Sequence, residues 1–398
     1  MEIIVQKFGG TSVSTPERRK MVIKKVKEVI DSGALPVVVV SAMGRKGEAY
    51  ATDTLLSLVG ERFKEENKMA TDMLMACGEI ISTVAMSNEF LEAGINAVPL
   101  TGGQAGILTD SNFKSAEPID IDPKHILTVL KAGKVPVIAG FQGVNRDGFF
   151  TTLGRGGSDT TGAILGVAVK AKEVQIFTDV DGIMTADPRI VSDAKLINKI
   201  SYNEIFELAD QGAKVIHPRA VEAAMRGNIP LVIKNTMSDC KGTMIDNLGD
   251  LEAATVITGI THQSDRIQVS INLDDNINNK AVYKSILAIL ADNEISLDLI
   301  NIFPKEKVFT IGEDKKVLFE SIMNEHNIKF ELIDNLSKIA VVGTKMRGIP
   351  GVIAKIVEAL DDKDIEVLQS ADSHMTIWCL VETNKVKDAI KALHQAFL

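Results

Sequence analysis

The feature that most constrains the fold of this chain is a series of short apolar segments separated by longer amphipathic ones. Six apolar segments lie in the first 237 residues, at 3–8, 36–41, 97–100, 135–139, 174–178 and 230–233. Residues 37–40 are four consecutive valines, and a strand with no polar position must be covered on both faces. This alternation of strand-like and helix-like segments predicts an α/β domain with a mostly parallel sheet.

Composition excludes several classes of protein. The 398 residues include 44 Lys+Arg and 53 Asp+Glu, a net charge of −9, which argues against a nucleic-acid partner. The longest strongly apolar stretch, residues 34–42, is far shorter than the ~20 residues that span a bilayer. The N-terminus lacks the features of a secretory signal, and the three cysteines are scattered without a CxxC pair. These observations predict no membrane association and a cytoplasmic location.

The C-terminal part of the chain contains an internal repeat. The sequence LADNEI at 290–295 resembles LDDKDI at 360–365, an offset of 70 residues. Each copy has a strand before a helix and two strands after it, which predicts two ferredoxin-like βαββαβ domains. Chance similarity of two helix–strand junctions is the alternative. We expect an N-terminal domain at 1–237, a linker at 238–258, and repeats at 259–335 and 336–398, with a strand near 256–262 available to the second repeat.

The first candidate site directly follows the first apolar segment and reads KFGGTS, from Lys7 to Ser12. Two glycines allow backbone N–H groups to approach an anion, and the lysine supplies a positive charge. The chain contains neither GxxxxGK[ST] nor GxGxxG, so a P-loop or a Rossmann dinucleotide site is not predicted. The motif therefore indicates a phosphate-binding loop of another kind, with a plain strand–turn as the alternative.

The second candidate site is GRGGSDTT, at 154–161. Arg155 could bind a carboxylate through two hydrogen bonds, and Asp159 could hold an amine or a metal. Ser158 and Asp159 are expected to cap the helix that follows, at 161–169. Two anion-binding motifs at strand ends favour a phosphoryl donor that faces an anionic acceptor.

A third acidic motif, TDVDG at 178–182, follows another apolar segment and precedes TADPR at 185–189. Acidic residues and a glycine turn after a strand are typical of nucleotide or magnesium contacts, and an Asx-turn is the alternative. Glu79 and Lys214, taken singly, would be interpreted as surface charges.

Taken together, the motifs resemble those of aspartokinase. They are KFGGTS at 7–12, SAM at 41–43, ATD at 51–53, GRGGSDTT, TDVDG and TADPR. The resemblance covers nearly the whole chain and implies an amino-acid-kinase αβα sandwich followed by two ACT domains. It implies ATP-dependent phosphorylation of the side-chain carboxylate of aspartate, the first step toward lysine, diaminopimelate and related amino acids. Mg²⁺ would be carried by ATP, with no metal ligand set fixed by the protein alone.

The resemblance also assigns roles to individual residues. Lys7, Asp159 and Ser41 would be catalytic. Aspartate would be bound by Thr52, Glu79, Arg155, Ser158 and Asp159. ATP would be bound by Lys7, Phe8, Gly9, Gly10, Thr178, Asp179, Met184, Arg189, Lys214 and Val215.

The chain departs from the family pattern at three places. Met184 stands where many relatives have tyrosine, so a stacking or hydroxyl contact is lost there. Residues 45–50 are inserted between Ser41 and Thr52. The first repeat has Asp and Asn at 274–279 in place of the Pro-Gly turn that the second repeat keeps at Pro350 and Gly351, which weighs against effector binding in the first repeat.

Regulation and assembly are implied by the ACT-like repeats. In aspartokinases these domains pair between subunits and sense end-product amino acids, so we expect a homodimer or a higher homo-oligomer with diaminopimelate, lysine or threonine as effector. The insertion and residues 369–378 resemble the diaminopimelate-inhibited enzymes of bacilli. The alternatives are another kinase of the same fold, such as acetylglutamate, glutamate or uridylate kinase, and an inactive amino-acid sensor. Retention of Lys7, Arg155 and Asp159 favours an active enzyme.

Overall fold

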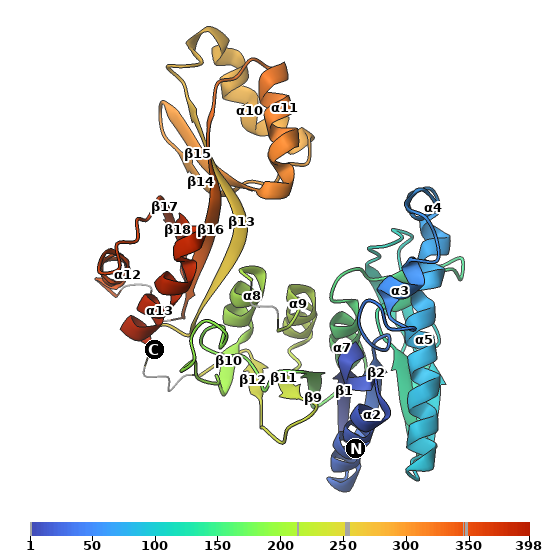
Figure 1. Ribbon diagram of the computed structural model, residues 1–398. Coiled ribbons are helices and arrows are strands. Elements are labelled where there is room, and N and C mark those ends of the chain that lie inside the picture. The colour runs from blue at the N-terminus through green and yellow to red at the C-terminus, as the bar shows by residue number, and fades with distance from the viewer. Residues whose placement is uncertain (1, 213–214, 251–254, 345, 347–348) are drawn as a thin grey trace. The chain divides into compact units, whose positions relative to one another are not determined.

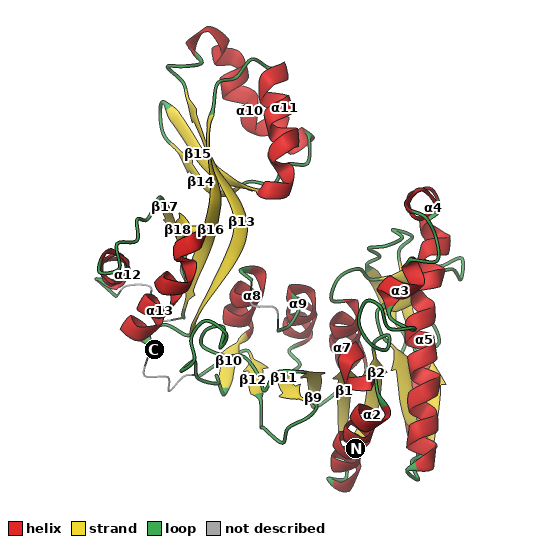
Figure 2. Cartoon of the chain, in the orientation of Figure 1, coloured by secondary structure: helices red, strands yellow, loops and turns green. Residues whose placement is uncertain are grey.

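The computed structural model describes residues 2–212, 215–250, 255–344, 346 and 349–398 (Figures 1 and 2). The chain forms two compact units. The first unit contains residues 1–183, 196–210 and 214–252, and the second contains 184–195, 211–213 and 253–398. The sequence predicts residues 184–195 to lie in the N-terminal domain. That segment belongs to the second unit because Ala186 and Val191 are buried in the core of the second repeat.

The first unit contains an eight-stranded sheet. Its strands, in spatial order, are β10 (Lys199–Ser201), β12 (Thr243–Asp246), β11 (Leu231–Asn235), β9 (Glu173–Thr178), β1 (Ile3–Phe8), β2 (Leu35–Val40), β6 (Val135–Ala139) and β3 (Ala97–Leu100). Every neighbouring pair is parallel except β11 and β12. The predicted parallel sheet is confirmed, and each of the six apolar segments supplies one of its strands.

Strand β12 corrects one expectation. It lies within residues 238–258, the predicted linker between domains. Thr243 and Ile245 are buried and alternate with less buried neighbours, so this short segment has the pattern of a strand and pairs with β11. The chain therefore completes the first sheet before the two C-terminal repeats begin.

Helices cover both faces of this sheet. They are α1 (Gly10–Val13), α2 (Pro16–Asp31), α3 (Thr52–Leu56), α4 (Glu61–Glu66), α5 (Lys68–Glu92), α6 (Lys124–Lys131), α7 (Gly157–Ala168), α8 (Tyr202–Asp210) and α9 (Pro218–Gly227). On one face, Val22 of α2 and Phe90 of α5 pack with Phe8 and Val38. On the other face, Gly162 of α7 lies so close to the sheet that an added Cβ would be 3.2 Å from the Lys7 side chain. Because strand side chains alternate, Phe8 enters the core while Lys7 faces α7.

Helix α5 is long and apolar enough to cross a membrane by length and composition alone, and no other described helix is. Half of its most apolar window is buried inside the first unit. Met86 and Phe90 are fully buried against α2 and the sheet. We therefore interpret α5 as a core helix of the α/β domain.

A small four-stranded sheet also belongs to the first unit. Its order is β5 (Pro118–Ile121), β4 (Ile107–Thr109), β7 (Gln142–Val144) and β8 (Phe150–Thr152). Helix α5 contacts β8, and the chain passes from β8 directly into α7. This sheet thus leads to the GRGG segment at 154–157.

The second unit is built on one six-stranded sheet. Its order is β14 (Asp298–Ile302), β15 (Glu306–Gly312), β13 (Gly259–Asn272), β16 (Glu331–Val342), β18 (Thr376–Glu382) and β17 (Gln369–Asp372). The helices of the first repeat are α10 (Lys280–Asp292) and α11 (Lys316–Glu325), and those of the second are α12 (Val352–Asp361) and α13 (Val386–Phe397). Short 3₁₀ helices are η1 (Ile277–Asn279), η2 (Glu313–Lys315) and η3 (Thr383–Lys385).

The two repeats share their longest strands. The first part of β13 pairs with the last part of β16, and the remainder of β13 pairs with the first part of β16. The register shifts between Gln263 and Gln268 separate the two parts. Each repeat then has its own apolar core under its own two helices, which is the arrangement of two βαββαβ domains.

Candidate functional site

A cavity of about 330 Å³ opens at the carboxyl ends of β1, β2 and β6 in the first unit. These strands are adjacent and parallel, and ligands of open α/β sheets bind at such strand ends. The cavity is lined by Lys7, Ser41, Thr52, Glu79, Phe141 and residues 154–159. The structure therefore brings together all the residues that the family resemblance predicts for catalysis and for aspartate binding.

Lys7 and Asp159 form an ion pair at the cavity wall. The Lys7 Nζ lies 2.6 Å from the Asp159 Oδ1, and both side chains are largely buried. Lys7 points away from the core because its neighbour Phe8 stacks on Phe177, with ring centroids 4.6 Å apart. Asp159 lies in the first turn of α7, where the helix dipole favours an anion. The pair fixes a positively charged ammonium at the cavity.

The start of α7 differs from the prediction. The N-cap is Gly156 in a left-handed conformation with φ of 67°, and Ser158 and Asp159 lie inside the helix without capping it. A Cβ at Gly156 would be 2.2 Å from the ring of His217, so only glycine fits there. Backbone N–H groups at a helix N-terminus lack intrahelical acceptors, which makes this end of α7 suitable for an anion.

The KFGG segment lies against the segment that follows β2. An added Cβ at Gly10 would be 2.4 Å from the carbonyl oxygen of Ala42. The Gly9 N–H donates to the Phe177 carbonyl (3.3 Å), and the Ser41 N–H donates to the Phe8 carbonyl (3.1 Å). Gly10 therefore permits the close approach of the KFGG segment to the segment that contains Ser41, and both Lys7 and Ser41 line the cavity.

Glu79 is a buried carboxylate on α5 that faces the cavity. Its Oε1 accepts a hydrogen bond from the Ala42 N–H at 3.1 Å. Its Oε2 is buried and has no hydrogen-bond partner among the described residues. Burial raises the pKa of Glu79 to about 8, although the Ala42 N–H acts in the opposite direction. A buried carboxylate with a hydrogen-bond partner at only one of its two oxygens is suited to bind a cationic ligand group.

Arg155 supplies the opposite charge. Arg155 lines the cavity and stands between Gly154 and Gly156 in the chain. No carboxylate of the described residues lies within ion-pair distance of its guanidinium. The cavity thus contains an unpaired cation and an unpaired acid, which is the requirement for binding a zwitterionic amino acid.

Thr52 begins α3, and the insertion before it is folded against neighbouring elements. The Gly47 N–H donates to the Thr54 Oγ1 at 3.1 Å. The Arg45 guanidinium pairs with the Asp179 carboxylate at 2.9 Å. Despite the longer spacing between Ser41 and Thr52, both residues reach the same cavity.

The residues predicted to bind ATP are dispersed. Among those that the structure describes, Lys7 alone lines the cavity. Phe8 is buried in the core, so only its backbone is available to a nucleotide. Thr178 ends β9, Asp179 follows it, and Val215 lies in a turn. Met184 and Arg189 belong to the second unit, where Arg189 pairs with Asp187 at 2.6 Å, and Lys214 lies outside the described residues.

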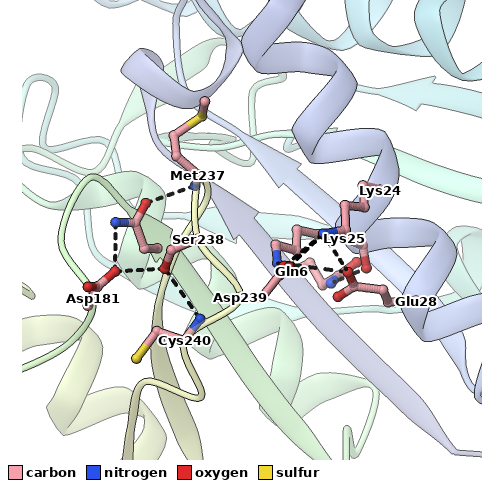
Figure 3. A network of polar contacts seen from close by, with 10 residues as sticks. Gln6, Lys24, Lys25, Glu28, Asp181, Met237, Ser238, Asp239 and Cys240 are labelled. Carbon is pink, nitrogen blue, oxygen red and sulfur yellow. Dashed lines mark hydrogen bonds and ion pairs between the residues drawn. The ribbon is translucent and has the colours of Figure 1, made fainter.

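Polar contacts fix the segment that follows β11, near the end of β9 (Figure 3). Asp239 accepts hydrogen bonds from Lys24 (2.8 Å) and Lys25 (2.7 Å) of α2, and these hold the pKa of Asp239 at about 2. The Ser238 hydroxyl donates to the Asp181 carboxylate at 2.7 Å. Asp179 pairs with Arg45, and Asp181 also accepts a hydrogen bond from the Asn235 side chain at 2.9 Å. Among the described residues no group of three His, Cys, Asp or Glu side chains is placed to hold a metal ion.

Phe141 lines the cavity but was not predicted. It follows Gly140 at the end of β6 and has a positive φ of 70°. The rule that ligands bind at the carboxyl ends of parallel strands could have identified it, because β6 was correctly predicted.

The fold and the cavity define a kinase of amino-acid-kinase architecture with appended regulatory repeats, and comparisons with known proteins agree. The amino acid kinase family model matches residues 2–235, and an ACT domain model matches residues 331–395. Aspartokinase 1 of Bacillus subtilis is 44% identical to this chain, over 100% of the chain and 99% of the relative. The aspartokinase of Geobacillus stearothermophilus is 37% identical, over 100% and 97%.

Solved structures show the same similarity. Escherichia coli aspartokinase III in complex with aspartate and ADP (R-state) has a TM-score of 0.79 at 25% identity, with 99% of each chain covered. The same enzyme in complex with lysine and aspartate (T-state) has a TM-score of 0.75. The chain belongs to the aspartokinases.

Proposed function

We propose that the cavity binds L-aspartate and that the γ-phosphoryl group of Mg·ATP is transferred to the substrate's β-carboxylate, giving 4-phospho-L-aspartate. The observation that most strongly supports this proposal is that Lys7 shares one cavity with two side chains that have no ionic partner among the described residues, the Arg155 guanidinium and the Glu79 carboxyl group. Glu79 would bind the α-amino group, and Arg155 a carboxylate. Aspartate and ADP in the E. coli relative support the same ligands.

The chemistry requires charge neutralisation more than proton transfer. A carboxylate is ionised at neutral pH, so no general base is needed, but an anion must approach an anionic phosphorus. Lys7 and the N-terminus of α7 would stabilise charge on the transferred group, and Asp159 would hold Lys7 in place. Mg²⁺ would be held by the ATP phosphates and would supply further charge neutralisation. Ser41, Thr52 and Ser158 would offer hydroxyl groups to the bound substrates.

The test is ADP release with Mg·ATP and each of four acceptors: L-aspartate, L-glutamate, N-acetylglutamate and UMP. We expect turnover with L-aspartate alone. Turnover with another acceptor would assign a different kinase of the same fold. Thermal stabilisation by an amino acid without any turnover would favour the inactive sensor.

Binding of aspartate is expected to release a proton. Because the pKa of Glu79 is about 8 in the empty cavity, the side chain is mostly neutral at pH 7 and must ionise to pair with an ammonium group. The KM for aspartate should therefore fall as pH rises from 6 to 8, by up to about tenfold per pH unit.

Calorimetry in two buffers of different ionisation enthalpy measures this proton directly. At pH 7 we expect close to one proton released per aspartate bound, and almost none at pH 9. Glu79→Gln should bind aspartate weakly and without proton release. A wild-type KM that is independent of pH between 6 and 8 would contradict the assignment of Glu79.

We also propose that an amino-acid effector bound to the second unit regulates the kinase activity. In the first repeat, the loop between β13 and α10 is held by one of its own side chains. Buried Asn276 donates hydrogen bonds to the carbonyls of Asn272 (2.8 Å) and Lys329 (2.9 Å) and accepts one from the Lys329 N–H (2.7 Å). This supports effector binding in the second repeat. Lysine in the E. coli T-state structure supports an amino-acid effector, which we propose to be diaminopimelate in a cytoplasmic homodimer or higher oligomer.

The whole enzyme should be assayed with lysine, threonine and meso-diaminopimelate, each added singly. We expect inhibition by meso-diaminopimelate, unchanged in Asn276→Ala, because the first-repeat loop is not the effector site. Stronger or altered inhibition in Asn276→Ala would place the effector in the first repeat. Sedimentation velocity on the same samples tests the oligomeric state.

A further inference from the structure

The start of α9 contacts the turn that carries Arg155. Helices α9 and α7 pack together within the first unit (Figure 1). His217 is the N-cap of α9, and Arg219 lies in its first turn. Residues 154–157 line the cavity, whereas His217 and Arg219 do not. These two side chains therefore touch the cavity wall without reaching the cavity, and neither has a role in the proposed chemistry.

The turn itself has little intrinsic preference for one conformation. Gly154 and Gly156 stand on either side of Arg155, and both have left-handed backbone angles, with φ of 73° and 67°. Glycine adopts other conformations as readily, so its own sterics do not hold it in this one. One hydrogen bond lies within the turn, from the Gly157 N–H to the Gly154 carbonyl at 3.0 Å. Contacts with other elements must supply the remaining restraint.

Arg219 supplies a contact on the N-terminal side of the turn. Its guanidinium donates to the Leu153 carbonyl and to the Glu117 carboxylate, the latter at 2.7 Å. Among the described residues no other group donates to the Leu153 carbonyl, and the Gly154 N–H has no acceptor. The guanidinium therefore makes the one hydrogen bond that fixes the direction of the peptide unit between Leu153 and Gly154.

The contacts made earlier in the chain do not replace this hydrogen bond. The Leu153 N–H donates to the Phe141 carbonyl at 2.9 Å, and the Thr152 N–H donates to the Asp72 carboxylate at 2.7 Å. Both contacts hold the chain only as far as the nitrogen of Leu153. The ψ angle of Leu153 and the φ angle of Gly154 come after that nitrogen, and they determine where the chain goes next.

His217 contacts the other side of the turn. The position that a Cβ at Gly156 would occupy is 2.2 Å from the Cβ and Cγ of His217, so the two residues are in direct contact. The His217 Nδ1 accepts a hydrogen bond from the Arg219 N–H at 3.3 Å, which fixes the ring relative to α9. The start of α9 thus holds the chain on both sides of Arg155.

We propose that Arg219 is a positioning residue, which together with the packed ring of His217 holds the turn at 153–156 in the conformation that places Arg155 at the cavity. This inference rests on the proposed function, because it takes Arg155 as a group that binds aspartate. It does not depend on which carboxylate of aspartate Arg155 contacts. Arg219 acts through Arg155 and does not touch the substrate.

The test is Arg219→Met, which keeps an aliphatic side chain and removes the donors. We expect the KM for aspartate to rise about tenfold, since small displacements of substrate-binding groups have effects of this size or larger. The kcat should change less than about threefold and the KM for ATP less than about twofold, because the lost interaction is one of substrate binding. Arg219→Lys keeps a positively charged donor and should recover most of the affinity for aspartate.

A double variant shows whether Arg219 acts through Arg155. In an Arg155→Ala enzyme there is no guanidinium to position, so adding Arg219→Met should leave the KM for aspartate where Arg155→Ala alone puts it. A further rise of about tenfold in the double variant would mean that the two residues act independently, and would overturn the inference.

Two further variants are matched controls. Glu117→Gln removes the ion pair of Arg219 but leaves the donation to the Leu153 carbonyl, so the KM for aspartate should stay at the wild-type value. Tyr202→Phe removes the hydrogen bond from the Tyr202 hydroxyl to the Ile229 carbonyl (2.6 Å), just beyond the other end of α9. It should lower Tm without a change in that KM.

The possible failures are distinguishable. A folded Arg219→Met enzyme with the wild-type KM for aspartate would overturn the inference alone, and so would an equal rise of KM in Tyr202→Phe. If Arg219→Met does not fold, His217→Asn replaces it: asparagine keeps a capping oxygen but not the ring, and the KM for aspartate should rise several-fold. A wild-type enzyme without aspartate-dependent ADP release would overturn the proposed function first, and this inference with it.

Discussion

Lys7→Ala is expected to lower kcat by a factor on the order of 10²–10³, with little change in the KM for aspartate. The ammonium group is held at the cavity by Asp159 at 2.6 Å, where the proposed phosphoryl transfer would develop negative charge. Removal of one preorganised electrostatic contact in a water-poor site typically has an effect of this size. Steady-state kinetics with ATP and aspartate varied separately measure it.

Lys172→Ala provides the matched control for that experiment. Lys172 is also in the first unit and paired with a carboxylate, Glu2 at 2.9 Å, but its side chain is 56% exposed. Its replacement should leave kcat and both KM values unchanged. Circular dichroism must show that Lys7→Ala is folded, because Asp159 loses its partner. A folded Lys7→Ala enzyme with wild-type kcat would remove the proposed role.

Arg155→Ala should instead raise the KM for aspartate, by a factor on the order of 10². The guanidinium is unpaired among the described residues and is free to bind a substrate carboxylate with two hydrogen bonds. Truncation of one partner of such a charged pair costs about 2–5 kcal/mol, and each 1.4 kcal/mol is tenfold in affinity. The loss should be seen in KM, while kcat at saturating aspartate is reduced much less.

Arg62→Ala is the corresponding control, because Arg62 lies on α4 with its side chain 87% exposed and pairs only with Glu66 among the described residues. We expect no change in either kinetic constant. If Arg155→Ala lowered kcat while its KM for aspartate stayed at the wild-type value, Arg155 would act on the transferred phosphoryl group and not on the substrate carboxylate.

Much of the fold was predictable from the sequence because its signals are local. The apolar segments that form β1, β2, β6 and β9 are continuous enough to be recognised without tertiary information. The small sheet was not predicted, since β4, β7 and β8 are three residues long and too short for a periodic pattern. Strand β12 was missed for the same reason, because four residues between polar turns resemble a linker.

The cavity residues were predictable to different degrees. The glycine motifs around Lys7 and Arg155 indicate anion binding by their own chemistry. Glu79 could be identified only through the family resemblance, since nothing local shows that this helix position is buried and faces a strand end. Asp72, a buried carboxylate on α5, had no sequence signal, because its hydrogen bonds are to Lys114 and Thr152, which lie 42 and 80 positions away in the chain. Long-range polar contacts of this kind are visible only in the folded structure.

The regiochemistry of a trapped product shows whether the β-carboxylate of aspartate is the group that is phosphorylated in this cavity. The wild-type enzyme is incubated with Mg·ATP, L-aspartate and hydroxylamine, and the hydroxamate is separated against synthetic α- and β-aspartyl hydroxamates. We predict β-aspartyl hydroxamate in equal amount to ADP, and formation of both more slowly in Lys7→Ala by a factor on the order of 10²–10³. ATP hydrolysis without hydroxamate, or the α-isomer as the main product, would show that the β-carboxylate is not the acceptor.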